Sequence, residues 1–218
     1  MLIKGKLNSN KYILAIHSTN KYFGFASRIV NNENPHDQFF IKKFDKDLSN
    51  NLIFDLSEFL SGTSLDSIER ITVSNGPANF NATRLIVVLA RTISQQIKCP
   101  LDYYSCYRIM AKRIALKNNI SNNNKPFWIM NHLRNRGYIA GKYIVDLSLN
   151  DSYNSIINEI IKPKLYKEIN YKNKYFEVDY DTKDDLIELL ELSYENHNKS
   201  VLNSWEDVLP IYPISAIN

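Results

Sequence analysis

The sequence has little cysteine and histidine, and neither residue type occurs in a spacing that builds a metal site. The two cysteines, Cys99 and Cys106, have no CxxC motif, so they indicate neither a disulfide framework nor a zinc site. The four histidines form no HxxxH or HExxH pattern, so no helix presents two ligands on one face. A GxSxG motif for a serine nucleophile is also missing. We therefore expect no metal and no hydrolytic centre, and free thiols are typical of a reducing cytoplasm.

Long hydrophobic runs are absent as well. The longest aliphatic run, 85–90, is far too short to span a bilayer, which takes about 20 apolar residues. The first 12 residues hold no sustained apolar segment of the kind found in signal peptides. We expect a cytoplasmic protein with no membrane contact. A length of 218 residues with 44% hydrophobic content is enough for a sizeable core in one or two globular domains.

Charge is unevenly distributed along the chain. The formal net charge of +4 is too small to indicate nucleic-acid binding by itself. Residues 1–101 include 12 basic and 8 acidic residues, 102–175 include 13 and 5, and 176–218 include 2 and 10. The three stretches therefore carry net charges of +4, +8 and −8.

Hydrophobic patterning predicts an α/β protein. Strands are expected at 12–19, 23–30, 37–44, 70–75 and 100–105, and helices over 49–62, 82–97 and 107–117. The polar segment 118–126 ends in proline and predicts a boundary between a domain at 1–117 and a smaller one at 118–218. Further strands are expected at 126–131 and 137–146, and helices at 154–161 and 182–195. This order predicts a mixed sheet with helices on its faces.

The stretch "SNGPANFNATR" at 74–84 lies between a predicted strand and a predicted helix, where phosphate-binding loops occur. Such a loop needs glycines, because backbone N–H groups must converge on the anion. One glycine makes a poor anion nest, and Asn81 can instead cap the following helix. We assign Gly76, Pro77, Asn79 and Asn81 to a vestigial loop. A working anion site at the helix N-terminus is the alternative.

Three segments together resemble the bacterial TsaB (YeaZ) family: "ILAIHSTN" at 13–20, "GPANFNATR" at 76–84 and "VLPIYP" at 208–213. Gly76, Pro77, Phe80 and Arg84 match the family loop, whereas Ala78, Asn79, Asn81 and Ala82 depart from it. Where the family has Asp-Thr-Ser after the first strand, this chain has His17, Ser18 and Thr19. The resemblance implies the ribonuclease-H-like, two-lobed fold of actin, hexokinase and Hsp70, with a reduced second lobe.

The resemblance also implies a function. TsaB-like proteins are non-catalytic scaffold subunits of the machinery that makes threonylcarbamoyladenosine on tRNA. They pair with the catalytic paralogue TsaD and support assembly with the ATPase TsaE, so tRNA contact would be indirect and no cofactor is expected. His17 agrees with a non-catalytic role, because the ATP-using members of this fold hold Mg²⁺ through a carboxylate there. A small-molecule kinase or ATPase dependent on Gly76 and Asn81 is the rival hypothesis, and a stand-alone RNA-binding module is the third.

Two surfaces are candidates for these contacts. The partner interface is expected on the two helices at 49–62 and 82–97, which TsaB-like proteins use for pairing or for a homodimer. Its residues are Phe54, Glu58, Val87, Ala90, Arg91 and Ser94, with Ile53, Leu85 and Leu89 among those expected in the core. A basic helix could contact RNA through Arg108, Lys112, Arg113 and Lys117. The acidic helix at 184–195 is expected to face solvent or a basic partner.

Overall fold

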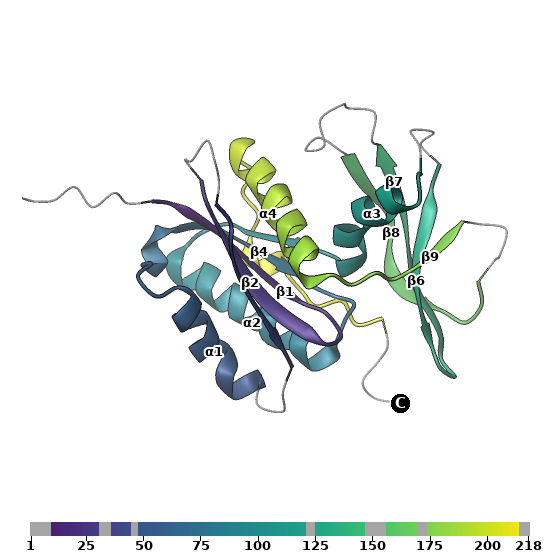
Figure 1. The fold of residues 1–218 in the computed structure, drawn as a ribbon, viewed down its shortest axis with the longest axis horizontal. Helices are drawn as coiled ribbons and strands as arrows, with labels where there is room; N and C mark the ends of the chain where they lie inside the picture. The colour runs from purple at the N-terminus through teal and green to yellow at the C-terminus, as the bar shows by residue number, and fades with distance from the viewer. Residues whose placement is uncertain are drawn as a thin grey trace, which may run out of the picture.

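The computed structural model describes residues 10–30, 36–44, 48–120, 125–146, 156–169 and 174–213. In this part of the chain, two β-sheets lie side by side and four α-helices pack against them (Figure 1). Two short 3-10 helices, η1 (Leu65–Ser67) and η2 (Trp205–Asp207), complete the description. The expected α/β class is confirmed.

The first sheet has five strands in the order β3-β2-β1-β4-β5. They are β1 (Tyr12–Ser18), β2 (Tyr22–Ile29), β3 (Gln38–Lys43), β4 (Ile68–Ser74) and β5 (Leu101–Tyr104). The first three form an antiparallel meander, whereas β4 pairs in parallel with β1 and β5 in parallel with β4. This mixed order confirms the expected ribonuclease-H-like fold.

Both faces of the first sheet are covered (Figure 1). The covering helices are α1 (Leu48–Phe59) and α2 (Phe80–Ile97) on one face and α4 (Thr182–Asn198) on the other. Alternate residues of β1 point to opposite faces. Leu14 and Ile16 therefore join the core under α1 and α2, whereas Ile13 and Ala15 pack against α4. This is why the run at 13–16 is apolar without interruption.

The second sheet is smaller and has the order β8-β7-β6-β9. Its strands are β6 (Phe127–Leu133), β7 (Gly137–Asp146), β8 (Ile156–Tyr166) and β9 (Tyr175–Glu177). α3 (Cys106–Lys117) covers one face of it, where Tyr107 and Met110 share a core with Phe127 and Ile129. Because α3 directly follows β5, it joins the two sheets.

The helix expected at 154–161 is wrong over residues 156–161, and residues 154 and 155 lie outside the described part of the chain. Apolar residues at 156, 157, 160 and 161 have a helical spacing, but the segment forms β8 and pairs with β7 in antiparallel fashion. The register of this pair shifts around Lys142, which disturbs the alternation expected of a strand. Pro163 is tolerated because β8 is an edge strand and needs no N–H donor on its free side.

The C-terminal part of the chain returns to the first sheet. α4 packs on β1 and β2, and Val208 joins the core under α1 and α2. The backbone N–H of Ile211 donates to the carbonyl of Asn75 at 2.7 Å, which ties the tail to the end of β4. The expected lobe at 118–218 is therefore divided: β6–β9 form the second sheet, whereas residues 182–213 pack with the first.

Candidate functional site

The loop between β4 and α2 is held by structural contacts on several sides. Gly76 has a φ of +98°, a conformation that favours glycine, and its carbonyl accepts from the N–H of Cys106 at 2.7 Å. The hydroxyl of Tyr180 donates to the carbonyl of Pro77 at 3.1 Å. Because Ile211 is also bound to Asn75, the loop connects β4 and α2 with α3 and with the segment that follows η2.

The capping residue of α2 is Asn79, and the assignment to Asn81 is wrong. The Asn79 side-chain oxygen accepts from the N–H of Ala82 at 3.1 Å, and the helix begins at Phe80, two residues earlier than expected. Asn81 is exposed in the first turn. Both asparagines suit a cap by residue type, so the sequence alone does not fix which one ends the loop.

His17 lies at the end of β1 and is fully buried. Its Nε2 lies 3.1 Å from Oδ2 of Asp185 on α4, and Oδ1 of Asp185 accepts from Nη1 of Arg113 at 2.8 Å. The prediction that His17 is a hydrogen-bonded strand-end residue is confirmed. Nearby, burial raises the pKa of the Cys106 thiol to about 12, so this thiol stays neutral and unreactive at physiological pH.

Three of the four cations on α3 form ion pairs within the chain. Lys112 lies 3.6 Å from Glu188, Arg113 2.8 Å from Asp185, and Lys117 3.0 Å from Asp179. The fourth, Arg108, stacks over the ring of Tyr104 at 4.6 Å. Two of these carboxylates, Asp185 and Glu188, lie on the acidic helix α4, which also pairs with Arg28 of β2 through Glu191. RNA contact through α3 stays a prediction. The ion pairs neutralise most of the positive charge of this helix.

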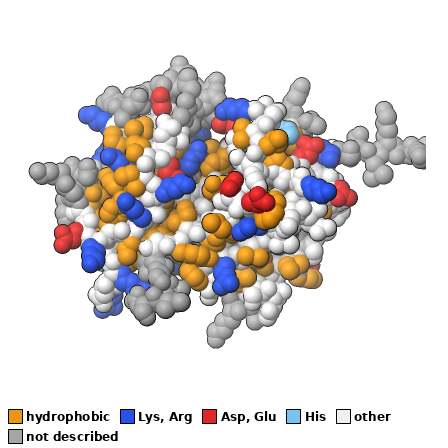
Figure 2. All heavy atoms as spheres, turned by 180° about the vertical axis from the view of Figure 1, so that it is seen from behind, with side chains coloured by type: hydrophobic (Ala, Val, Ile, Leu, Met, Phe, Trp, Pro, Cys, Tyr) orange, Lys and Arg blue, Asp and Glu red, His pale blue; other side chains and the backbone are white. Residues whose placement is uncertain are grey.

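Other basic residues remain on the surface. Figure 2 shows Lys and Arg side chains spread over the half of the molecule that the second sheet forms. This agrees with the net charge of +8 over residues 102–175, because most of that stretch builds α3 and the second sheet.

The expected interface residues on α2 are corrected by their burial. Val87 is 1% exposed, and Ala90 and Ser94 are fully buried in the core of the first sheet. These small residues let α2 approach the sheet closely, whereas the sequence suggested that they admit another helix. Arg91 stacks over the ring of Trp205 at 5.4 Å. The face of α2 that reaches solvent instead contains Val88, which is 54% exposed.

On α1 the expected exposed phenylalanine is found, with an apolar neighbour. Phe54 is 60% exposed and Glu58 is exposed, as expected, but Ile53, expected in the core, is 69% exposed. A groove of about 500 Å³ lies between the N-terminal parts of α1 and α2, and both Asn81 and Arg84 line it. The two helices thus present apolar side chains and a hollow on one side of the molecule.

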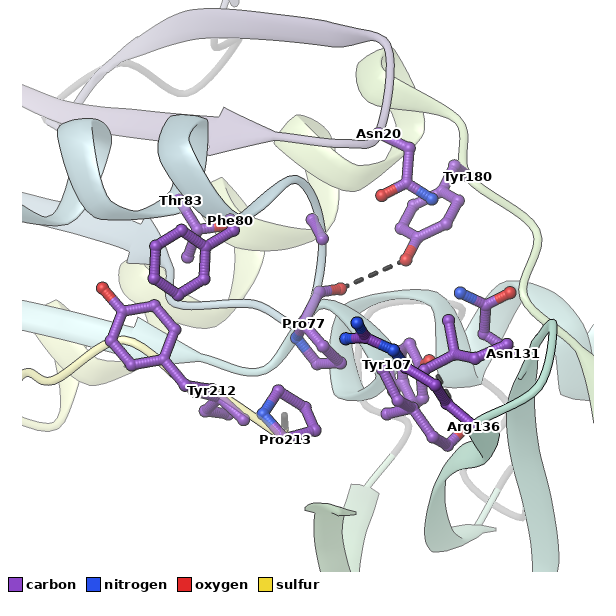
Figure 3. Close-up of a pocket in the computed structure, with 14 residues that line it drawn as sticks. Asn20, Pro77, Phe80, Thr83, Tyr107, Asn131, Arg136, Tyr180, Tyr212 and Pro213 are labelled. Atoms are coloured by element: carbon purple, nitrogen blue, oxygen red, sulfur yellow. Dashed lines mark hydrogen bonds between the residues drawn. The ribbon is translucent and has the colours of Figure 1, made fainter. Parts of the chain in front are cut away.

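A second hollow, which the sequence did not predict, lies between the two sheets. It encloses about 380 Å³ next to the loop at 76–80 (Figure 3). Six of the residues around it are Asn20, Phe80, Tyr107, Arg136, Tyr180 and Tyr212. These residues come from well-separated segments, so no sequence spacing points to them. Burial raises the pKa of Tyr180 well above 10, so its hydroxyl stays protonated and donates to Pro77.

Metal sites and membrane spans are two further features to consider. Within the described ranges, no group of three or more His, Cys, Asp or Glu side chains could hold a metal ion. None of the described helices combines the length and apolar character needed to cross a membrane.

Comparison with known proteins identifies the fold. No protein-family model matches the sequence, and no curated protein matches it significantly. Among solved structures, YeaZ from Pseudomonas aeruginosa is similar with a TM-score of 0.61 and 13% identity, over 93% of this chain and 99% of that one. An uncharacterized protein with similarity to peptidase YEAZ from Pseudomonas aeruginosa gives a TM-score of 0.62 and 14% identity, over 94% and 100%. The chain thus has the fold of YeaZ along nearly its whole length.

Proposed function

We propose that the chain is a YeaZ-like, non-catalytic scaffold subunit. It would pair with a larger TsaD-like catalytic paralogue and support assembly with a TsaE-like ATPase in the modification of tRNA. The likeness to YeaZ over whole chains supports this reading. ATP-using proteins of this fold need a carboxylate at the end of the first strand. In this chain the position is occupied by His17, whose Nε2 lies within hydrogen-bond distance of Asp185. A small-molecule kinase or ATPase remains the rival, and nucleotide-dependent melting would favour it.

The observation that carries the proposal is the exposure of large apolar side chains on both α1 and α2. Ile53, Phe54 and Val88 are each more than half exposed. Leaving such a side chain in water forgoes about 1.5–3 kcal/mol of burial, which a partner could supply. The groove between the two helices adds the concave surface into which a partner side chain could insert. The same surface would serve a homodimer when the paralogue is missing.

The test is co-expression with a TsaD-like protein, followed by size-exclusion chromatography. We expect Phe54→Glu and Val88→Glu to abolish co-elution, because each places a charge in the contact. Leu202→Glu is the matched control, since Leu202 is 83% exposed and belongs to neither helix, lying between α4 and η2. Normal co-elution of both interface variants would contradict the proposed interface.

RNA contact is a second candidate function, favoured by the outer face of the second sheet. Phe127 and Ile129 pack toward α3, so Trp128 between them points to the other face. There Lys142 lies 5.7 Å from the Trp128 ring, and the Tyr166 ring lies 5.6 Å from it. Lys164 stacks over Tyr166 at 5.3 Å. Aromatic rings and cations on one sheet can stack bases and contact phosphates.

This second candidate predicts salt-dependent binding of single-stranded RNA. We expect the double variant Lys142→Ala, Lys164→Ala to bind more weakly. The slope of log affinity against log salt concentration should fall in magnitude by about two, because two phosphate contacts are lost. Lys112→Ala with Lys117→Ala is the control, because these α3 cations already form ion pairs. If the α3 pair has the larger effect, the RNA surface is the one predicted from the sequence.

A further inference from the structure

The pocket between the two sheets has flat, aromatic walls. The rings of Phe80 and Tyr212 lie 4.6 Å apart at one side, and Tyr107 and Tyr180 line it as well (Figure 3). Its volume of about 380 Å³ falls in the range of about 300–1,000 Å³ typical of small-molecule sites. Aromatic side chains in the lining favour a ligand with a flat ring, because aromatic rings pack against one another in offset-stacked or edge-to-face arrangements.

Polar groups in the pocket lack partners. Thr83 is 2% exposed, yet its Oγ1 has no hydrogen-bond partner in the described part of the structure. The side chains of Asn20, Asn131 and Arg136 also line the pocket, and no hydrogen bond or ion pair of theirs is found among the described residues. Buried polar groups in folded proteins are normally paired. A ligand would supply the partner that the hydroxyl of Thr83 lacks.

The charge of the lining selects the class of ligand. Among the described residues that line the pocket, Arg136 is the one charged residue and none is acidic. A guanidinium binds a carboxylate or phosphate through parallel N–H donors. With a single cation and no carboxylate among these described residues, the lining does not suit a metal-bound polyphosphate.

We propose that this pocket binds a small organic molecule with a flat ring and one anionic group, either a carboxylate or a phosphate monoester. Arg136 holds the anionic group, the aromatic walls pack against the ring, and Thr83 with the two asparagine amides bonds polar substituents. The inference rests on the pocket alone and stands or falls independently of the scaffold role proposed for α1 and α2.

Isothermal titration calorimetry of the full chain tests the proposal with four probes: indole-3-acetate, indole-3-acetamide, AMP and adenosine. We expect the anion of at least one pair to bind about tenfold more tightly than its neutral counterpart, because charge-assisted hydrogen bonds are the stronger ones. Binding of indole-3-acetate alone identifies a carboxylate site, and binding of AMP alone a phosphate site. No binding of any probe, or equal binding of anions and neutral molecules, overturns the proposal.

Variants connect that binding to the pocket. Arg136→Gln should weaken the anion by about tenfold, whereas Arg134→Gln should bind as the wild type does. Both arginines are exposed and lie between β6 and β7, but only Arg136 lines the pocket. Thr83→Val should melt at the same or a higher temperature without ligand and bind the anion more weakly. Full affinity in Arg136→Gln would place the ligand elsewhere and overturn the proposal.

Discussion

The two faces of the first sheet are held by different interactions. Under α1 and α2 the core is almost entirely apolar, and the buried carboxylate of Asp55 there pairs with the partly exposed Lys42 at 3.0 Å. Under α4 the apolar contacts of Leu186, Leu189 and Leu190 are joined by several buried charged groups. Both helical layers bury apolar area, but among the described residues α4 makes more directional polar contacts with the sheet than α1 and α2 do.

Asp102 on β5 is the most connected of these groups. The fully buried carboxylate accepts from Nη1 of Arg70 at 2.9 Å, from Ser193 at 2.7 Å and from Asn196 at 3.0 Å. Asn203, beyond α4, donates to it as well, at 2.6 Å. This one side chain thus joins the sheet, the end of α4 and the tail.

The difference follows from distance along the chain. α1 and α2 lie next in sequence to the strands they cover, so apolar burial suffices to place them. α4 arrives from far away: His17 and Asp185 are 168 residues apart. We infer that its buried charges specify one position of α4 on the sheet, because unpaired buried charges make other positions costly.

The largest expected effect comes from Asp102→Ala. Arg70 is 3% exposed, so the variant leaves a buried guanidinium and several buried donors without their acceptor. Removing one partner of a buried pair costs about 3–5 kcal/mol, and urea denaturation should show a loss of free energy of unfolding of that order.

Asp66→Ala is the control for this variant. Asp66 is exposed on η1, where removing a carboxylate changes stability by less than about 0.5 kcal/mol. If Asp102→Ala were as mild as this control, the polar contacts of α4 would not hold the helix to the sheet.

The second-largest effect is expected when a buried apolar side chain is shortened on either face of the sheet. Ile86 on α2 and Leu189 on α4 are both fully buried, on opposite sides of the sheet. Ile86→Ala and Leu189→Ala should each cost about 2–5 kcal/mol in chemical denaturation, because each leaves a cavity. Similar costs would show that apolar packing is shared by both faces and that the polar contacts are what sets α4 apart. A negligible cost for Leu189→Ala would show that polar contacts alone hold α4.

Much of the first sheet could be predicted from the sequence. The uninterrupted apolar run of β1 and the apolar periodicity of α2 each reflect burial against near neighbours, so local patterning carries the information. Local pattern also indicated that Phe54 is exposed. It was less exact about ends and faces: Asn79 rather than Asn81 caps α2, and Val87 belongs to the core.

The rest depends on contacts between distant segments. The sequence showed α4 as an acidic helix but not that Asp185 meets His17 and Arg113. It indicated a helix where β8 forms, because apolar spacing at 156–161 fits both structures until the pairing with β7 decides. The pocket beside Thr83 and Arg136 is lined by residues near both sheets and by residues 211–213, so no local sequence motif predicts it.

The smallest expected effect concerns Glu188, on the α4 face near Lys112. Burial raises the pKa of this carboxyl above 4.5, and the attraction of Lys112 offsets the rise only in part. The folded state therefore holds its proton to a higher pH than the unfolded state does, so ionisation costs stability as pH rises from the unfolded to the folded pKa. Glu188→Gln removes that loss, and urea titrations should show it gaining stability relative to wild type as pH rises above 4.5. If the difference in free energy of unfolding between the variant and wild type did not change with pH, the ion pair with Lys112 would fully compensate for the burial of Glu188. The charge of Glu188 would then not destabilise the packing of α4.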